Sequence, residues 1–243
     1  RYFDGLVSLS RDYLAGVTYD GAVLMLGGDL LSGDIHEELS ETNADTTLGS
    51  LLYWSELIAA GIAQLRDTFG HVHVLAVVGN HGRRTRKPRA KRRARDNYDW
   101  LLARMIAREF RGDDNVTFTI PDGADAAVTV YDTRYVLSHG DQFRGGNGVA
   151  GIWSPISRGH LRKARRDDAI GQSWDWLVMG HWHQLVWGQG WVVNGSMKGL
   201  DEYAYLANHT PERPQQAMWL TTPEHGITCQ MPVIVSDRRK EGW

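Results

Sequence analysis

The chain has 243 residues, of which 42% are apolar and 23% charged, so the composition predicts a globular protein and argues against disorder. Its formal net charge is −2, and no apolar run approaches the roughly 18 residues that a membrane-spanning helix needs, so we expect no membrane segment. Cys229 is the only cysteine, which excludes an internal disulfide and a cysteine-based zinc site and favours a reducing compartment, the cytoplasm.

The first third of the chain alternates between helical and strand-like patterns. Tyr2–Val17 has apolar residues at helical spacing, and the short apolar run Ala22–Leu26 reads as a buried strand. Leu51–Phe69 keeps helical spacing for about five turns, and Val72–Val78 is a second strand-like run. A strand, a long helix and a second strand predict a βαβ unit with a parallel strand pair.

A block of positive charge follows. Residues 83–95 hold nine of the 27 Lys and Arg residues and no acid, so the rest of the chain has 27 − 9 = 18 basic against 29 acidic residues, a formal charge of −11. Such a block is either a solvated loop or a surface for a polyanion. After it, Tyr98–Phe110 reads as an amphipathic helix with Asn97 as its N-cap.

The remaining elements are mostly short and β-rich. The predicted strands are Ala127–Tyr131, Tyr135–Ser138, Trp176–Met179, Leu185–Trp187 and Trp191–Val193. A basic amphipathic segment lies near His160–Trp174. No repeat or linker divides the chain, so we expect a single α/β domain over residues 1–243, a layered β-sandwich flanked by helices.

Four short stretches place metal-capable side chains just after strand-like runs. Ligands at strand ends can meet on one rim of a sheet, and carboxylate, amide oxygen and imidazole together suit a borderline divalent ion such as Mn²⁺, Fe²⁺, Zn²⁺ or Ni²⁺. Each stretch alone is also ordinary turn chemistry, and only their order and spacing together indicate a site. The stretches are Gly28-Asp29, Gly79-Asn80-His81, Ser138-His139-Gly140 and Gly180-His181-Trp182-His183.

With these motifs the sequence resembles the calcineurin-like metallophosphoesterase family, whose pattern runs D-x-H, GD, GNH followed by an acid, a single His, and GHxH. The resemblance spans about residues 22–195 and implies the family's fold, with two divalent ions, Mn²⁺ first and Mg²⁺ also an option, at the C-terminal ends of strands. It implies that His81 acts on the phosphate or the leaving group and does not bind metal. The metal ligands that it implies are Asp29, Asn80, His139, His181 and His183.

Two positions depart from the family pattern. No D-x-H motif lies between Arg1 and Ala22, so we expect the first strand and its motif to precede Arg1; Asp34-Ile35-His36 comes after Asp29 and reads as a loop near the site. Gly82 stands where the family has an acid, which removes an expected partner of His81.

The resemblance implies phosphoester hydrolysis, in which two adjacent metal ions polarise the phosphate and lower the pKa of a bridging water to produce hydroxide for in-line attack. Arg83 and Arg84 directly follow the GNHG stretch and are candidates for substrate binding, with DNA as the candidate polyanion and the family's phage or bacterial nuclease branch as a candidate relative. A phosphatase for small molecules differs in substrate alone. The alternative of another class is a non-catalytic metal- or nucleic-acid-binding scaffold with a degenerate site.

Overall fold

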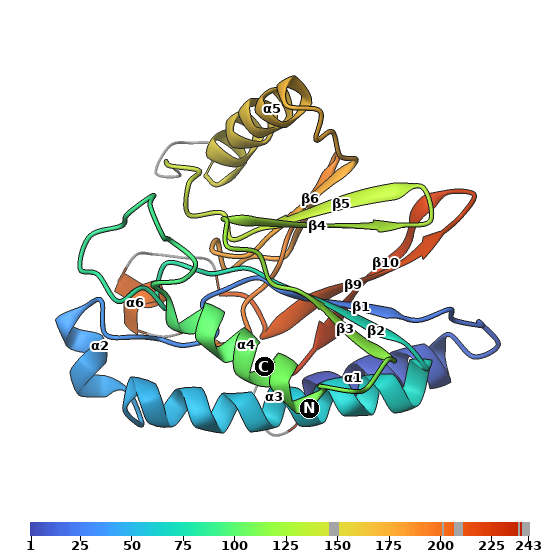
Figure 1. The fold of residues 1–243 in the computed structure, drawn as a ribbon, viewed down its shortest axis with the longest axis horizontal. Helices are drawn as coiled ribbons and strands as arrows, with labels where there is room; N and C mark the ends of the chain where they lie inside the picture. Colours follow the sequence, from blue (N-terminus) through green and yellow to red (C-terminus); the bar gives the residue numbers. More distant parts are fainter. Residues whose placement is uncertain (146–150, 201, 207–210, 238, 240–243) are drawn as a thin grey trace. The chain divides into compact units, whose positions relative to one another are not determined.

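The computed structural model describes residues 1–145, 151–200, 202–206, 211–237 and 239 (Figure 1). Its chain packs into two compact units. The βαβ unit comprises Thr18–Val128 and Val136–Arg144, and the hairpin unit comprises Arg1–Val17, Thr129–Tyr135 and Gly145–Trp243.

The βαβ unit is built on a three-stranded parallel sheet of order β1-β2-β3. The strands are β1 (Ala22–Leu26), β2 (Val72–Ala76) and β3 (Val116–Thr119), with Ala22 opposite Val72 and Val72 opposite Val116. Because β1 and β2 are parallel, their C-terminal ends lie at the same edge. The predicted βαβ unit and its parallel pair are therefore confirmed.

Three helices connect these strands. α2 (Glu37–Thr42) and α3 (Thr47–Phe69) lie between β1 and β2, and α4 (Tyr98–Glu109) lies between β2 and β3. Thr46 caps the N-terminus of α3, where its hydroxyl accepts a hydrogen bond from the Gly49 backbone N–H at 3.1 Å, and Gly70, which has a φ of +79°, caps the C-terminus. The N-cap predicted at Asn97 is confirmed, since its side chain accepts the Asp99 backbone N–H at 2.8 Å.

α3 packs one face against the sheet and α4. Leu51, Ile58, Ile62 and Leu65 recur at helical spacing and are at most 9% exposed, while Leu52 on the outer face is 57% exposed. Among the described helices, α3 alone is long and apolar enough to cross a membrane by length and composition. The core helix of a globular unit passes the same test, but α3 is buried on one face only, and its outer face exposes Leu48, Leu52, Tyr53, Trp54 and Leu57.

The hairpin unit begins with α1 (Tyr2–Ser8), which continues into the π-helical turn η1 (Leu9–Tyr13). Strands β4 (Asp125–Val130) and β5 (Thr133–Ser138) contribute Thr129–Tyr135 to this unit and belong to a five-stranded sheet of order β4-β5-β6-β8-β7. The other elements are β6 (Trp176–Met179), β7 (Val186–Gly188), β8 (Trp191–Val193), the helices α5 (Trp153–Ala169) and α6 (Glu202–Leu206), and the antiparallel hairpin of β9 (Gln215–Thr222) and β10 (Gly226–Ile234).

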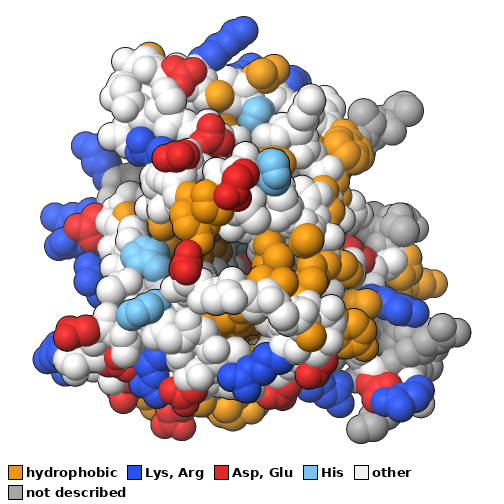
Figure 2. Space-filling model, turned by 90° about the vertical axis from the view of Figure 1, so that its right-hand side faces the viewer, with side chains coloured by type: hydrophobic (Ala, Val, Ile, Leu, Met, Phe, Trp, Pro, Cys, Tyr) orange, Lys and Arg blue, Asp and Glu red, His pale blue; other side chains and the backbone are white. Residues whose placement is uncertain are grey.

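The α/β class with several sheets flanked by helices is confirmed, and most predicted elements form. The helix predicted over Tyr2–Val17 ends earlier, at Tyr13, and the amphipathic segment near His160 begins already at Trp153. The sequence patterns did not predict α2, β3, α6 or the β9-β10 hairpin. On the face shown in Figure 2, basic and acidic side chains are interspersed.

The packing of α3 predicts a sharp difference between its two faces. Leu65→Ala should lower the free energy of unfolding by about 2–5 kcal/mol, because Leu65 is 1% exposed and its removal leaves a cavity. Leu52→Ala, on the exposed face, should change it by less than about 0.5 kcal/mol. Urea titration followed by circular dichroism measures both. Equal losses would show that the outer face of α3 is packed as tightly as the inner one.

Candidate metal and phosphate site

Two loops of the βαβ unit meet beyond the ends of β1 and β2, and glycines allow their close approach. Gly28 has a φ of +86°, and a Cβ there would overlap the backbone of Gly79. A Cβ at Gly79 would in turn overlap the carboxylate of Asp29. The glycines of the GD and GNH motifs are therefore required by backbone contact between the two motifs.

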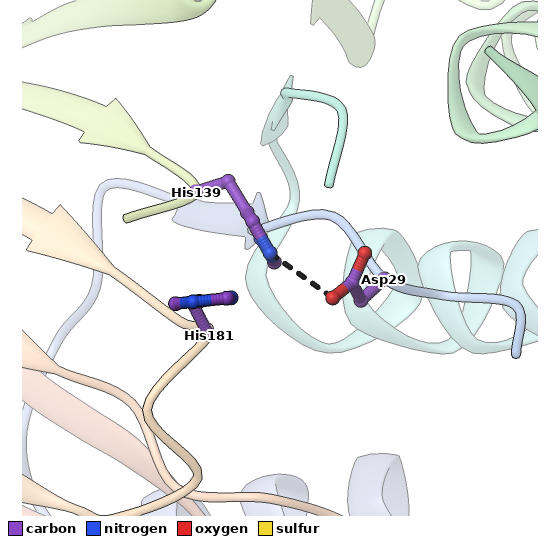
Figure 3. Close-up of side chains that lie close together, drawn as sticks. All are labelled: Asp29, His139 and His181. Atoms are coloured by element: carbon purple, nitrogen blue, oxygen red, sulfur yellow. Dashed lines mark ion pairs between the residues drawn. The ribbon is translucent and has the colours of Figure 1, made fainter. Parts of the chain in front are cut away.

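The carboxylate of Asp29 lies between the backbone of one loop and an imidazole (Figure 3). Its Oδ1 accepts the backbone N–H of His81 at 2.7 Å, and its Oδ2 lies 3.0 Å from Nε2 of His139. Burial alone would raise the pKa of Asp29, but the hydrogen bond and charge of His139, with a smaller contribution from His81, lower it to about 2. Asp29 is therefore an anion in a largely buried position.

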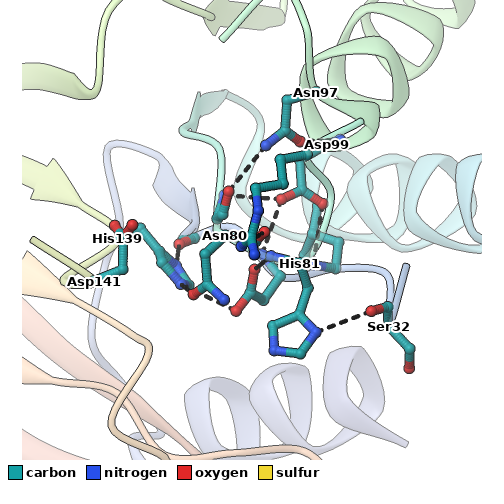
Figure 4. A network of polar contacts seen from close by, with 12 residues as sticks. Ser32, Asn80, His81, Asn97, Asp99, His139 and Asp141 are labelled. Carbon is teal, nitrogen blue, oxygen red and sulfur yellow. Dashed lines mark hydrogen bonds and ion pairs between the residues drawn. The ribbon is translucent and has the colours of Figure 1, made fainter. Parts of the chain in front are cut away.

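His139 follows β5 and is 2% exposed. Its Nδ1 lies 2.8 Å from the carbonyl oxygen of Gly27, which can only accept, so Nδ1 carries the hydrogen. Its Nε2 then faces both Asp29 Oδ2 and, at 3.1 Å, Asn80 Oδ1 (Figure 4). Three electron-pair donors converge there, and such an arrangement needs a cation among them, either a proton on Nε2 or a metal ion. Burial lowers the pKa of His139, but Asp29 outweighs that effect and raises it.

Asp99, in the first turn of α4, connects the two loops through its carboxylate. Its carboxylate accepts the backbone N–H groups of Asp29 at 2.9 Å, Leu30 at 3.2 Å and Gly79 at 2.8 Å, and it is 1% exposed. Burial and the charge of Asp29 raise the pKa of Asp99 to about 6, although these hydrogen bonds oppose the shift. Sequence reasoning did not find this residue; the only local signal was the N-cap at Asn97.

At position 82, where the resemblance led us to expect an acid, the structure leaves no room for a side chain. A Cβ at Gly82 would overlap Asn97 Oδ1 and lie 3.0 Å from the carboxyl carbon of Asp99. The Asn97 side chain also donates to the Gly79 carbonyl at 2.9 Å. Asn97 and Asp99 thus occupy the volume that a side chain at position 82 would need.

His81 is oriented by a backbone carbonyl and not by an acid. Its Nδ1 lies 2.9 Å from the Ser32 carbonyl oxygen, so Nδ1 carries the hydrogen and Nε2 is left to accept or to be protonated (Figure 4). The ring of His36 packs edge-on against it, with 5.8 Å between the centroids. Asp34-Ile35-His36 lies in the loop before α2, which agrees with its interpretation as a loop near the site.

Arg83 and Arg84 make contacts within their own unit. The guanidinium of Arg83 donates to the backbone carbonyls of Asn80 at 2.7 Å, Thr85 at 3.0 Å and Arg86 at 3.3 Å. Arg84 forms an exposed ion pair with Asp96 at 3.2 Å. Their role in substrate binding stays a prediction.

His181 and His183 belong to the hairpin unit, in the loop between β6 and β7. Both have left-handed backbones, with φ of +63° and +55°, and Asp29 has a φ of +53°. Such conformations are costly for residues other than glycine and are often found at functional sites. His183 lines a small pocket of this unit together with Ser196, Lys198 and Glu212.

The βαβ unit thus brings together Asp29, Asn80 and His139, with His81 beside them on the same loop as Asn80. This grouping was predicted from the strand-end motifs. Carboxylate, amide and imidazole are a donor set that fits a divalent transition-metal ion, and the hydrogen bond of His139 Nδ1 to a backbone carbonyl is the usual orientation of a metal-binding histidine.

No protein-family model matches this sequence, and no curated protein matches it with significance. Among solved structures, a single mutant of Vps29 from Entamoeba histolytica is similar at 15% identity with a TM-score of 0.38, covering 88% of this chain and 99% of that chain. A double mutant of the same protein is similar at 13% identity with a TM-score of 0.36, covering 89% and 97%. Information about function therefore comes from the side chains of the site.

The position of Asp99 predicts a large structural penalty for its loss. Asp99→Ala should lower the free energy of unfolding by about 3 kcal/mol, because it removes the acceptor of three backbone N–H groups, of which that of Gly79 is buried and the other two are partly buried. Asp114→Ala, at an exposed acid after α4, should change it by less than about 0.5 kcal/mol. Denaturant titrations of both variants test this, and equal stability of the two would contradict the structural role of Asp99.

Proposed function

We propose that this protein is a metal-dependent phosphoesterase whose metal site is built on Asp29, Asn80 and His139 of the βαβ unit. His181 and His183, in the hairpin unit, stay predicted ligands. The observation that carries the proposal is the convergence of three electron-pair donors, Asp29 Oδ2, Asn80 Oδ1 and His139 Nε2, with the two oxygens within 3.1 Å of the nitrogen. The second carboxylate oxygen of Asp29 and the second ring nitrogen of His139 already contact the backbone, which supports a preformed cation site.

One or two divalent ions bound there would supply a Lewis acid for the phosphate and lower the pKa of a bound water. Mn²⁺ is the first ion to test. The residues of the chain hold the geometry for that chemistry. Asp29 Oδ2 points to the site while Oδ1 is held by the His81 N–H, and Asp99 holds the backbone of Asp29 and Gly79. Hydrogen bonds among three segments, the loop after β1, the loop after β2 and α4, therefore support the site.

His81 is proposed as the catalytic residue that acts on the phosphate. The Ser32 carbonyl holds the hydrogen on Nδ1, so a second proton can be carried only on Nε2. An imidazole in that state can donate to a phosphate oxygen or protonate the leaving oxygen. In this role the Ser32 carbonyl replaces the acid that is absent at position 82.

The proposed substrate is a phosphodiester, with DNA as the candidate polymer, because nine basic residues follow the GNH motif directly. A phosphomonoester is the alternative within the same chemistry. We place this activity in the cytoplasm, where the single exposed Cys229 would stay reduced.

Asp29→Asn should lower metal content and activity together, since it removes the one carboxylate among the three converging donors. We expect Mn²⁺ affinity to fall at least about tenfold and hydrolysis of bis(p-nitrophenyl) phosphate to fall about 100-fold or more. Elemental analysis after Mn²⁺ loading and a chromogenic assay measure the two effects, and Asp114→Asn is the matched control. Unchanged metal content and activity would refute this role of Asp29.

His81→Gln should keep the metal and lose turnover by about 10²–10⁴-fold, because His81 is assigned to proton transfer and not to metal binding. His36→Gln, which alters the imidazole packed beside it, should have a small effect. If metal content falls as in Asp29→Asn, His81 is a ligand instead. If the parent protein binds metal but hydrolyses neither diesters nor monoesters with any divalent ion, the non-catalytic scaffold is the correct function.

A further inference from the structure

The basic block seen in the sequence is part of a built loop, which we define as the basic loop, residues 83–97. Its base is closed by a β-bridge between Arg83 and Asn97, and the Tyr98 N–H donates to the Gly82 carbonyl at 2.7 Å. Ala94 within the loop is fully buried. The loop leads directly into α4 (Figure 1) and is therefore anchored at both ends and in the middle.

Four of its nine cations hold the loop in place. Arg83 donates to three backbone carbonyls, including that of Asn80. Arg84, Arg93 and Arg95 form ion pairs with Asp96 at 3.2 Å, Asp141 at 2.8 Å and Asp122 at 2.6 Å, respectively. Because these groups are engaged within the βαβ unit, they are not the first candidates for contact with a ligand.

The other five cations are exposed, and in the described part of the chain no carboxylate pairs with them. They are Arg86, Lys87, Arg89, Lys91 and Arg92. Five neighbouring positive charges repel one another, and an anion between them relieves that repulsion. Arg92 additionally has a left-handed backbone with a φ of +57°, an unusual conformation for arginine.

Three of these five cations line a small pocket that reaches the proposed metal site. Arg89, Lys91 and Arg92 share it with Gly79 and Asn80. Asp96 is the one acid among the lining residues, and it is already paired with Arg84. The pocket is thus lined both by unpaired cations and by Asn80, whose side-chain oxygen faces His139.

We infer that this pocket binds a phosphate group of a nucleic-acid strand, one that neighbours the phosphate to be hydrolysed. Arginine pairs with phosphate oxygens in a forked geometry, and binding a chain of phosphates releases its counterions. The position of this phosphate next to the cleaved one rests on the proposed function, whereas the binding of the strand to the pocket is independent of it. Arg89, Lys91 and Arg92 are the residues that we assign to contact with the strand. Arg83 also lines the pocket, and substrate binding by Arg83 and Arg84 stays a prediction.

The test measures binding without catalysis. The affinity of a fluorescently labelled 12-nucleotide DNA strand is determined by anisotropy in EDTA at several salt concentrations, for the parent and for R89Q/K91Q/R92N. The matched control is R104Q/R108Q/R111Q, which removes three exposed positive charges from α4 and the turn after it. Asn is used at position 92 because it tolerates a positive φ.

We expect R89Q/K91Q/R92N to bind about 100-fold more weakly near 0.1 M salt, with a salt slope smaller by about two units, since each lost single-strand contact contributes about 0.7. The control should stay within about threefold of the parent. An oligonucleotide with an uncharged methylphosphonate backbone should not bind, and inorganic polyphosphate should compete with DNA. If polyphosphate alone binds, the strand assignment is wrong.

Equal affinity of the parent and R89Q/K91Q/R92N overturns the inference, as does an equal loss in the control. Melting temperatures establish that the variants are folded. The double variant R89Q/K91Q, which leaves Arg92 unchanged, should show about two thirds of the slope change of the triple variant. Hydrolysis of the small chromogenic diester separates the two proposals. If the parent hydrolyses the diester but R89Q/K91Q/R92N binds DNA as the parent does, the proposed function stands and the inference about the pocket is wrong. If the parent hydrolyses no diester but R89Q/K91Q/R92N loses DNA binding, the inference about the pocket stands and the proposed function is wrong.

Discussion

The carboxylate of Asp99 is the constraint on which the geometry of the site depends. It accepts three backbone N–H groups, two from the loop after β1 and one from the loop after β2, so a single side chain sets the distance between the two strand-end loops. The carboxylate of Asp29 and the amide of Asn80 project from the loops that it holds. Asp99 also lies close enough to Asp29 for the two charges to raise the pKa of Asp99.

Two buried carboxylates and an amide oxygen close together stabilise a positive charge between them. Within the βαβ unit His139 can carry that charge, because Asp29 raises its pKa despite burial. A proton on His139 and a divalent ion would satisfy the same electrostatic demand, and they compete because both would use Nε2. The site therefore has the electrostatic character expected of a metal centre, in agreement with its donor chemistry.

The basic residues of the basic loop fall into two groups, those that anchor the loop and those that are exposed. A block of nine basic residues in a sequence has the composition of a solvated loop or of a ligand surface. In the structure some of these residues anchor the loop, and the exposed ones are those to which we assign polyanion binding. The cations that reach backbone carbonyls or carboxylates anchor the loop, and this anchoring holds the remaining cations at the pocket beside Asn80. Because the loop is already anchored, it loses less conformational entropy when it binds a polyanion.

The sequence by itself determined the elements whose signals are local. β1, β2, α3 and α4 follow from apolar periodicity, and the start of α4 follows from Asn97, because both signals are complete within a few residues. The strand-end motifs also placed Asp29, Asn80 and His139 among the site residues. Only the tertiary structure revealed Asp99, the reason for Gly82 and the division of the basic loop. Asp99 lies 20 residues from Gly79 and 70 from Asp29, and no periodic pattern encodes which distant N–H groups a buried carboxylate will accept.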